Sequence, residues 1–159
     1  MIKSAILSKN RKHRYLLSRI WDLNNENILF IMLNPSSADE DIDDATTTKV
    51  ISFSKKWGYG GLHICNLYTY RTSSPKKLFS VPKNKRGSNK SEIKNYAKKC
   101  SKIVYAWGNK EKVPPWLNQM VPNPSFIELS KEGVPKHPLY LKSLIVFFHY
   151  LITIFQIHP

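Results

Sequence analysis

The chain has 159 residues, of which 42% are hydrophobic and 23% are charged, and its formal net charge is +14. These values are typical of one globular domain and exclude a disordered chain or two full-sized domains. Two cysteines, Cys65 and Cys100, exclude a disulfide framework and are expected to be small buried residues in a reducing compartment. No long apolar stretch precedes the basic run Lys9–Lys12, so we expect no signal peptide, a cytoplasmic location and no stable membrane insertion.

The charges are unevenly distributed along the chain. Five acidic residues lie within 39–44, whereas ten basic residues and one acid lie within 76–102. A basic surface with a separate acidic cluster suits a polyanionic partner, nucleic acid or nucleotide, that approaches one face. A lysine-rich solvated surface would carry the same charge, so the pattern leaves both interpretations open.

The first half of the chain predicts two core strands with a helix between them. Six consecutive apolar residues, 28–33, end at Asn34-Pro35 and predict a strand buried on both faces, as in parallel sheets. Apolar residues then recur at helical spacing over 46–57, with Asp44 as N-cap and Gly58 as a C-terminal stop. The segment 62–67 predicts the second core strand.

The second half continues this alternation. A long basic connection leads to a helix near 91–100, a third strand over 103–106, a short helix over 114–120 and a fourth strand over 126–129. Residues 15–17 are expected to add an edge strand. The whole pattern predicts a single three-layer α/β domain over residues 1–141, with a central, mainly parallel sheet covered by helices.

The carboxyl ends of the strands are the expected place for a ligand, because open α/β sheets bind ligands beyond these ends. The segments predicted to meet there are Asn34-Pro35-Ser36, the residues after Leu67, Trp107-Gly108 and the loop after Leu129. The carboxamide of Asn34 could orient a water or bind a base edge, and Ser36 and Ser37 add hydroxyls. An ordinary Asn-Pro turn that closes a strand would have the same sequence.

Other side chains of these loops are further candidates. His137 is flanked by prolines whose stiff backbone would present the imidazole from a fixed position, although it could be a lone surface histidine. Trp107-Gly108 could form a flat wall for an aromatic ligand, or be a core tryptophan and the glycine that ends its strand. Arg71 could contact a phosphate.

The pair Asp43-Asp44 has the pattern of a helix N-terminus, in which Asp43 is freer than Asp44 to serve a ligand. No histidine or cysteine stands nearby at ligand spacing, so no metal and no cofactor are expected.

Several segments together resemble a family of uncharacterised bacterial and phage proteins defined by a domain of unknown function, from about Arg14 to Leu141. These segments are Arg14–Trp21, Met32–Asp39, Asp43-Asp44-x-Thr46, Trp57–Gly61, Asn66-Leu67, Arg71-Thr72, Ala106–Gly108 and His137–Leu141.

The order of these motifs also resembles, more distantly, the uracil-DNA glycosylase superfamily, which implies a fold of that type and an N-glycosidase that acts on a base in nucleic acid. By this resemblance Asn34 would orient the attacking water and His137 would stabilise the departing base anion. Leu141 would align with the wedge that enters the duplex. Met32-Leu33, Ser36 and Leu139-Tyr140 depart from the superfamily pattern, and the loss of small residues there could block a flipped nucleotide.

The residues expected to contact the substrate are Pro35, Ser36, Ser37, Asp43, Asn66, Arg71, Trp107, Gly108 and Leu141. Two alternatives to the glycosidase remain open. One is a nucleic-acid-binding module that kept the fold without the chemistry, and the other is an enzyme that acts on a free nucleotide.

Residues 142–159 form an atypical hydrophobic tail, in which Leu144, Phe148, Leu151 and Phe155 share one helical face. A packed terminal helix is expected, because a spanning helix needs ~20 apolar residues and this stretch is shorter. A membrane-surface helix and a tail altered by a frameshift are the alternatives.

Overall fold

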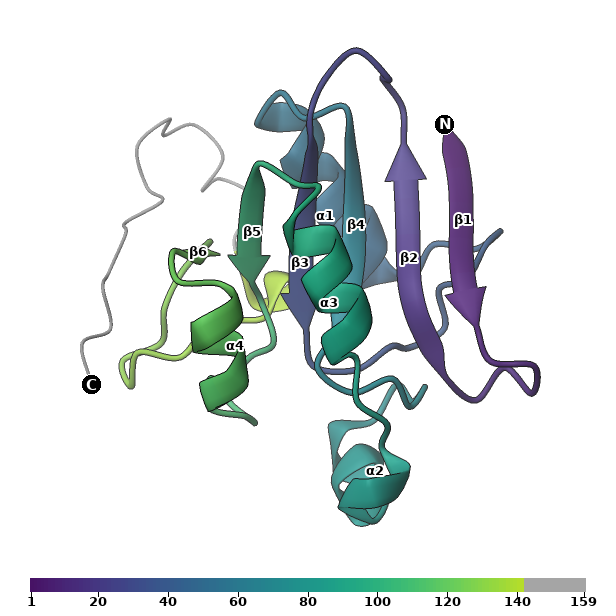
Figure 1. Ribbon diagram of the computed structural model, residues 1–159, viewed down its shortest axis with the longest axis vertical. Coiled ribbons are helices and arrows are strands. Elements are labelled where there is room, and N and C mark those ends of the chain that lie inside the picture. Colours follow the sequence, from purple (N-terminus) through teal and green to yellow (C-terminus); the bar gives the residue numbers. More distant parts are fainter. Residues whose placement is uncertain (142–159) are drawn as a thin grey trace.

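The computed structural model describes residues 1–141, which form a mixed α/β fold around one six-stranded sheet. The strands are β1 (Ile2–Leu7), β2 (Arg14–Ile20), β3 (Asn27–Met32), β4 (Gly61–Asn66), β5 (Lys102–Tyr105) and β6 (Ser125–Phe126). Their order in the sheet is β1-β2-β4-β3-β5-β6 (Figure 1). The pairs β1/β2 and β2/β4 are antiparallel and the other three are parallel, which confirms the predicted mainly parallel sheet.

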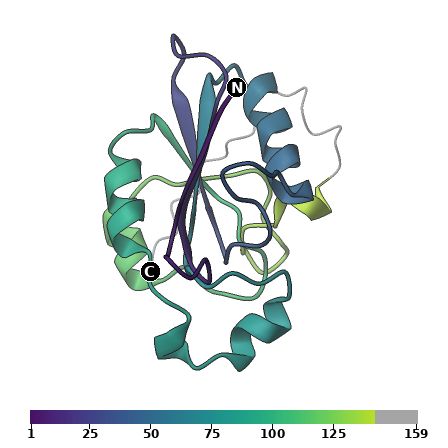
Figure 2. The same cartoon turned by 90° about the vertical axis from the view of Figure 1, so that its right-hand side faces the viewer.

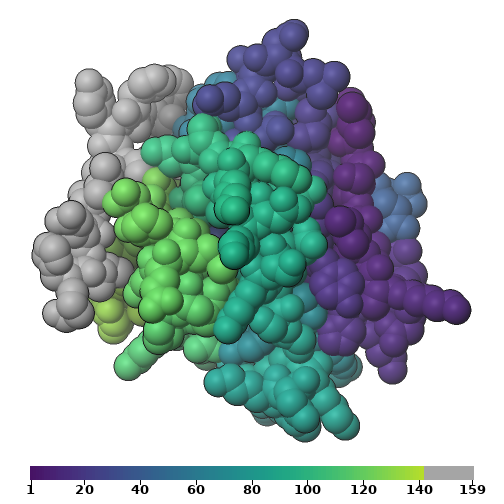
Figure 3. Space-filling model, in the orientation of Figure 1, coloured from purple at the N-terminus to yellow at the C-terminus, as the bar shows by residue number. Residues whose placement is uncertain are grey.

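Helices cover both faces of this sheet and make the molecule three layers thick. They are α1 (Ala45–Lys56), α2 (Pro75–Ser80), α3 (Lys90–Ala97) and α4 (Pro115–Met120), with short 3-10 turns at Lys83–Lys85 and Pro138–Tyr140. With the sheet seen edge-on, α1 lies on one side and α3 and α4 lie on the other (Figure 2). On the side of α3, the teal and green atoms of α2, α3 and α4 hide the central strands (Figure 3).

The apolar run of β3 explains why this strand is central. Ile28, Phe30 and Met32 belong to the core cluster on the side of α1, whereas Leu29 and Ile31 belong to the cluster on the side of α3. Successive side chains of a strand point to opposite faces, so a strand covered on both faces is apolar at every position.

The first helix begins and ends where the sequence predicts. The Asp44 side chain accepts a 2.8 Å hydrogen bond from the backbone N–H of Thr47, which confirms it as the N-cap of α1. Gly58 follows the helix with a φ of +83°, a conformation that glycine adopts without the steric cost of a Cβ.

Four expectations need correction. The strand around residues 15–17 is β2, and it is not an edge strand, because the unpredicted strand β1 pairs along its outer side. The fourth strand ends at Phe126, after which the chain folds back and Leu129 bridges Pro135. The basic connection contains the unpredicted helix α2, whose N-cap is Ser74. The helix near 91–100 ends at Ala97.

The strand order fixes where a ligand can bind. The strands β3 and β5 are neighbours in the sheet, but the chain runs from β3 to β4 on one side and from β5 to β6 on the other. The loops that follow β3 and β5 therefore lead in opposite directions, and the sheet has a switch point between these two strands. No helix within residues 1–141 is long and apolar enough to cross a membrane. The expected tail helix lies outside the described residues.

Candidate functional site

A cavity of about 660 Å³ opens at the carboxyl edge of the parallel strands. The loops after all four parallel strands contribute to its lining, together with the first turn of α1. Residues that line it include Arg14, Asn34, Ser36, Asp44–Thr47, Asn66, Thr72, Ser73, Trp107–Lys110, Lys136, His137, Leu139 and Tyr140. The volume falls within the range of pockets that hold small molecules and cofactors.

Asn34 is held in one orientation at this cavity. Its Nδ2 donates to the carbonyl oxygen of Thr72 at 2.7 Å and to that of Pro35 at 3.0 Å. Both partners are acceptors, so the amide nitrogen must face them and Oδ1 must point the other way. No residue within 1–141 donates to Oδ1. Asn34 therefore offers the cavity an acceptor that the loop backbone holds in place.

His137 enters the same cavity as a neutral ring. Its Nδ1 accepts a 3.3 Å hydrogen bond from the backbone N–H of Leu139, which leaves the ring proton on Nε2. Burial lowers the pKa of His137, although the nearby carboxylate of Asp44 partly opposes this shift. At neutral pH His137 is thus a hydrogen-bond donor without a charge, and it lines the same cavity as the acceptor of Asn34.

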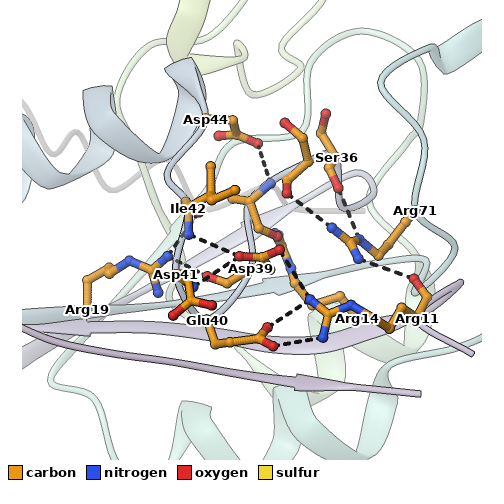
Figure 4. A network of polar contacts seen from close by, with 12 residues as sticks. Arg11, Arg14, Arg19, Ser36, Asp39, Glu40, Asp41, Ile42, Asp44 and Arg71 are labelled. Atoms are coloured by element: carbon orange, nitrogen blue, oxygen red, sulfur yellow. Dashed lines mark hydrogen bonds and ion pairs between the residues drawn. The ribbon is translucent and has the colours of Figure 1, made fainter. Parts of the chain in front are cut away.

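The loop between β3 and α1 is held by arginines that approach it from three segments (Figure 4). Arg71 donates to the carbonyl oxygens of Ser36 at 3.2 Å and Ser37 at 3.1 Å. Arg19, whose side chain is fully buried, pairs with Asp43 at 2.6 Å, and Arg11 pairs with the carboxylates of the same loop. Three of the five acids in this cluster, Asp39, Glu40 and Asp43, are therefore paired with basic side chains of the protein itself.

Arg14 is the main residue of the cavity that sequence reasoning missed. It is 3% exposed, and its guanidinium donates to the carbonyl oxygen of Ala38 at 2.8 Å and to Oδ1 of Asn66 at 3.2 Å. A signal was present, because an arginine at the start of the apolar segment Tyr15–Leu17 belongs to a core strand and not to a solvated surface.

The structure brings six of the predicted site residues together at the cavity and leaves five outside it. Those inside are Asn34, Ser36, Asn66, Trp107, Gly108 and His137. Ser37 and Arg71 line an adjoining groove, while Asp43 is engaged with Arg19 and Lys3. Pro35 and Leu141 are buried. Their roles toward a substrate stay predictions.

Two of the predicted contacts have a clear structural role as well. Trp107 is 2% exposed and its Nε1 donates to the carbonyl oxygen of Glu111 at 2.9 Å, so it is a core tryptophan with one edge at the cavity. Leu141 is 3% exposed, and its carbonyl oxygen accepts a hydrogen bond from Lys49 of α1. The exposed side chains of this final loop are instead Leu139 and Tyr140.

Metal binding has no support in the described part of the chain, where no group of three or more His, Cys, Asp and Glu side chains is arranged around a common point. The polar groups of the cavity are mainly amides, hydroxyls and basic groups, and Asp44 is the one carboxylate among its lining residues.

One comparison with known proteins gives a match. A family model described as a protein of unknown function, DUF1643, matches residues 14–139. No curated protein and no solved structure matches the chain.

Proposed function

Because the chain belongs to the DUF1643 family, whose function is unknown, we propose its function from the cavity: an N-glycosidase that releases a base from nucleic acid. The observation that carries the proposal is the pair formed by Asn34 and His137. One is an oriented acceptor and the other a neutral donor, and both line a cavity large enough for a nucleoside.

In this reaction Oδ1 of Asn34 accepts a hydrogen bond from a water and directs its oxygen toward C1′ of the sugar. The new C1′–O bond forms while the bond from C1′ to the base nitrogen breaks. The bonding electrons leave with the base, whose developing negative charge accepts a hydrogen bond from Nε2 of His137. The proton lost by the water ends on the released base. The resemblance of the motif order to the uracil-DNA glycosylase superfamily supports these roles.

The test is base release from oligonucleotides that carry uracil, hypoxanthine or other altered bases, followed by cleavage at abasic sites. Asn34→Ala and His137→Ala should each slow release by roughly 100-fold or more. Lys131→Gln, which changes an exposed lysine outside both cavities, should leave the rate unchanged. No release across a broad panel, or full activity in Asn34→Ala, would exclude the glycosidase.

A non-catalytic nucleic-acid-binding module is the second candidate, and the adjoining groove favours it. This groove, about 360 Å³, is lined by Lys12 and Arg71, which form no ion pair within residues 1–141, and by Arg11, which pairs with Asp39 and Glu40. It shares Ser36, Thr72 and Ser73 with the main cavity. A basic track that leads into a pocket suits a strand whose phosphates follow the track. If the protein is such a module, its affinity for nucleic acid should fall with rising salt concentration. Lys12→Gln should weaken this binding and Asn34→Ala should leave it unchanged.

The third candidate, an enzyme acting on a free nucleotide, needs a cavity that binds the ligand without a nucleic-acid strand. Thermal-shift measurements with nucleotides separate it from the second, because a ligand seated in the main cavity should stabilise the fold.

A further inference from the structure

Arg14 carries a buried charge that the described residues do not neutralise. Its Nε is buried and has no hydrogen-bond partner, and no carboxylate of residues 1–141 lies within 4.0 Å of its guanidinium. Arg19 and Arg11, by contrast, each form an ion pair with the acidic loop. A buried charge is costly unless it is paired, so the position of Arg14 calls for an anion.

The guanidinium keeps its charge at neutral pH. Burial lowers the pKa of Arg14 to about 10, a shift that the more distant carboxylate of Asp44 partly opposes and that the charges of Arg71 and Arg19 reinforce. A group with this pKa is still protonated at pH 7, and an anion beside it would restore part of the lost stabilisation.

The first turn of α1 stands at the same cavity and adds free donors. The backbone N–H groups of Ala45 and Thr46 have no hydrogen-bond partner within residues 1–141, because the Asp44 side chain caps only the N–H of Thr47. Unpaired N–H groups at the start of a twelve-residue helix favour a bound anion.

The remaining charges of the cavity also leave room for an anion. Lys110 forms no ion pair within the described residues, whereas Lys136 is paired with Glu128. The opposing carboxylate is Asp44, and it already accepts hydrogen bonds from the N–H groups of Thr47 and Ala38.

We propose that Arg14 and the first turn of α1 form an anion subsite within the cavity, which takes the phosphate of a nucleotide unit. The inference rests on the proposed function only in assigning the phosphate to a nucleotide. Two kinds of ligand could supply this phosphate: a free nucleotide, through its 5′-phosphate, and a nucleic-acid strand, through a phosphate of its backbone.

Calorimetric titration of the full chain at low salt tests the subsite with four probes: inorganic phosphate, a nucleoside 5′-monophosphate, the matching nucleoside and a short single-stranded oligonucleotide. Inorganic phosphate should bind, and the monophosphate should bind at least tenfold more tightly than the nucleoside. Tighter binding of the monophosphate than of the oligonucleotide assigns the subsite to free nucleotides, and the reverse assigns it to a strand. Equal affinity for nucleoside and monophosphate overturns the proposal.

Two variants locate the phosphate. Arg14→Gln should abolish phosphate binding, but Arg14 also holds Ala38 and Asn66, so this variant can fail to fold. Ala45→Pro avoids that difficulty. Proline suits the first position of a helix, Asp44 already has the extended conformation that precedes a proline, and the substitution removes one free N–H.

Ala45→Pro should weaken phosphate binding at least fivefold, while Lys131→Gln, which removes a charge outside both cavities, should change it less than twofold. Unchanged phosphate affinity in folded Ala45→Pro overturns the subsite. Binding is measured without turnover, so a failure to release bases excludes the glycosidase and leaves this result standing.

Discussion

The side-chain amide of Asn34 and the carbonyl oxygen of Thr72 form a 2.7 Å hydrogen bond that joins the end of β3 to the loop after β4. The backbone N–H of Thr72 donates in turn to the carbonyl oxygen of Pro35 at 2.8 Å. These bonds close a small ring of contacts between the two loops. Asn34 therefore shapes the cavity in addition to any part it has in chemistry.

Asn34→Asp should lower the free energy of unfolding by about 2 kcal/mol, because a carboxylate would face two carbonyl oxygens without a donor between them. Asn34→Ala should lower it by about 1 kcal/mol, the usual contribution of such hydrogen bonds. Urea denaturation measures both. Ser36→Ala is the matched control, since no hydrogen bond within residues 1–141 involves that hydroxyl. An Asn34→Asp protein as stable as the wild type would contradict this role of the amide.

Asp43→Asn should lower the free energy of unfolding by about 3 kcal/mol, because it leaves the fully buried guanidinium of Arg19 without a counter-charge. Burial alone would raise the pKa of Asp43, but hydrogen bonds from Lys3 and Arg19 outweigh it and hold the pKa below its usual range. The carboxylate is thus charged in the folded protein at neutral pH. Thermal or urea unfolding measures the loss.

Glu40→Gln is the control for this ion pair. Glu40 pairs with Arg11 at the surface, where an ion pair contributes about 0.5 kcal/mol or less. If Asp43→Asn keeps full stability but loses ligand binding, Asp43 serves the ligand after all, and the structural role given to it here is wrong.

The elements of the sheet that bury apolar side chains could be predicted from sequence. The strand β3 and the helix α1 carry strong periodic patterns and a recognisable cap. The strand β1 carries none, because it is exposed along most of its length and is held by backbone pairing with β2. Helix α2 has only six residues, and Leu78 is its only buried residue, so its sequence shows no apolar periodicity that would predict a helix.

The location of the cavity could also be predicted, since parallel strands bring their carboxyl ends to one edge. The contacts of Arg14 could not. They join β2 to Ala38 in the loop between β3 and α1 and to Asn66 at the end of β4. Contacts between segments so far apart along the chain leave no pattern in a single sequence. A guanidinium such as that of Arg71 can bind phosphate, but in the structure it donates hydrogen bonds to backbone carbonyl oxygens.

Gly108→Ala should lower the free energy of unfolding by about 1 kcal/mol and place a methyl group in contact with His137. The φ of Gly108 is +81°, which is unfavourable for alanine, and the added Cβ would lie 3.4 Å from Cβ of His137. Gly133→Ala is a matched control, because Gly133 has a φ of +74° but open space around its missing Cβ. Both variants should lose similar stability in urea, and only Gly108→Ala, whose methyl group would narrow the cavity beside His137, should impair base release. Equal impairment in both would mean that the loss of activity comes from reduced stability and not from the methyl group beside His137.

The stability of the protein should fall as the pH drops from about 6.5 toward 4, and His63 should account for much of the loss. Burial lowers the pKa of His63 to about 4, with a further contribution from Lys99, and Nδ1 is hydrogen-bonded to the hydroxyl of Ser18 at 2.7 Å. In this window the unfolded chain binds a proton at His63 that the folded protein does not, so acid favours unfolding.

For a half-buried ring the effect is on the order of 2 kcal/mol. His63→Gln removes this titration and should flatten the dependence of the unfolding free energy on pH. A residual slope should remain from His137, whose pKa is also lowered. Urea unfolding of both proteins between pH 4 and 7 measures the difference. Parallel curves for wild type and His63→Gln would show that His63 is protonated equally in the folded and unfolded states.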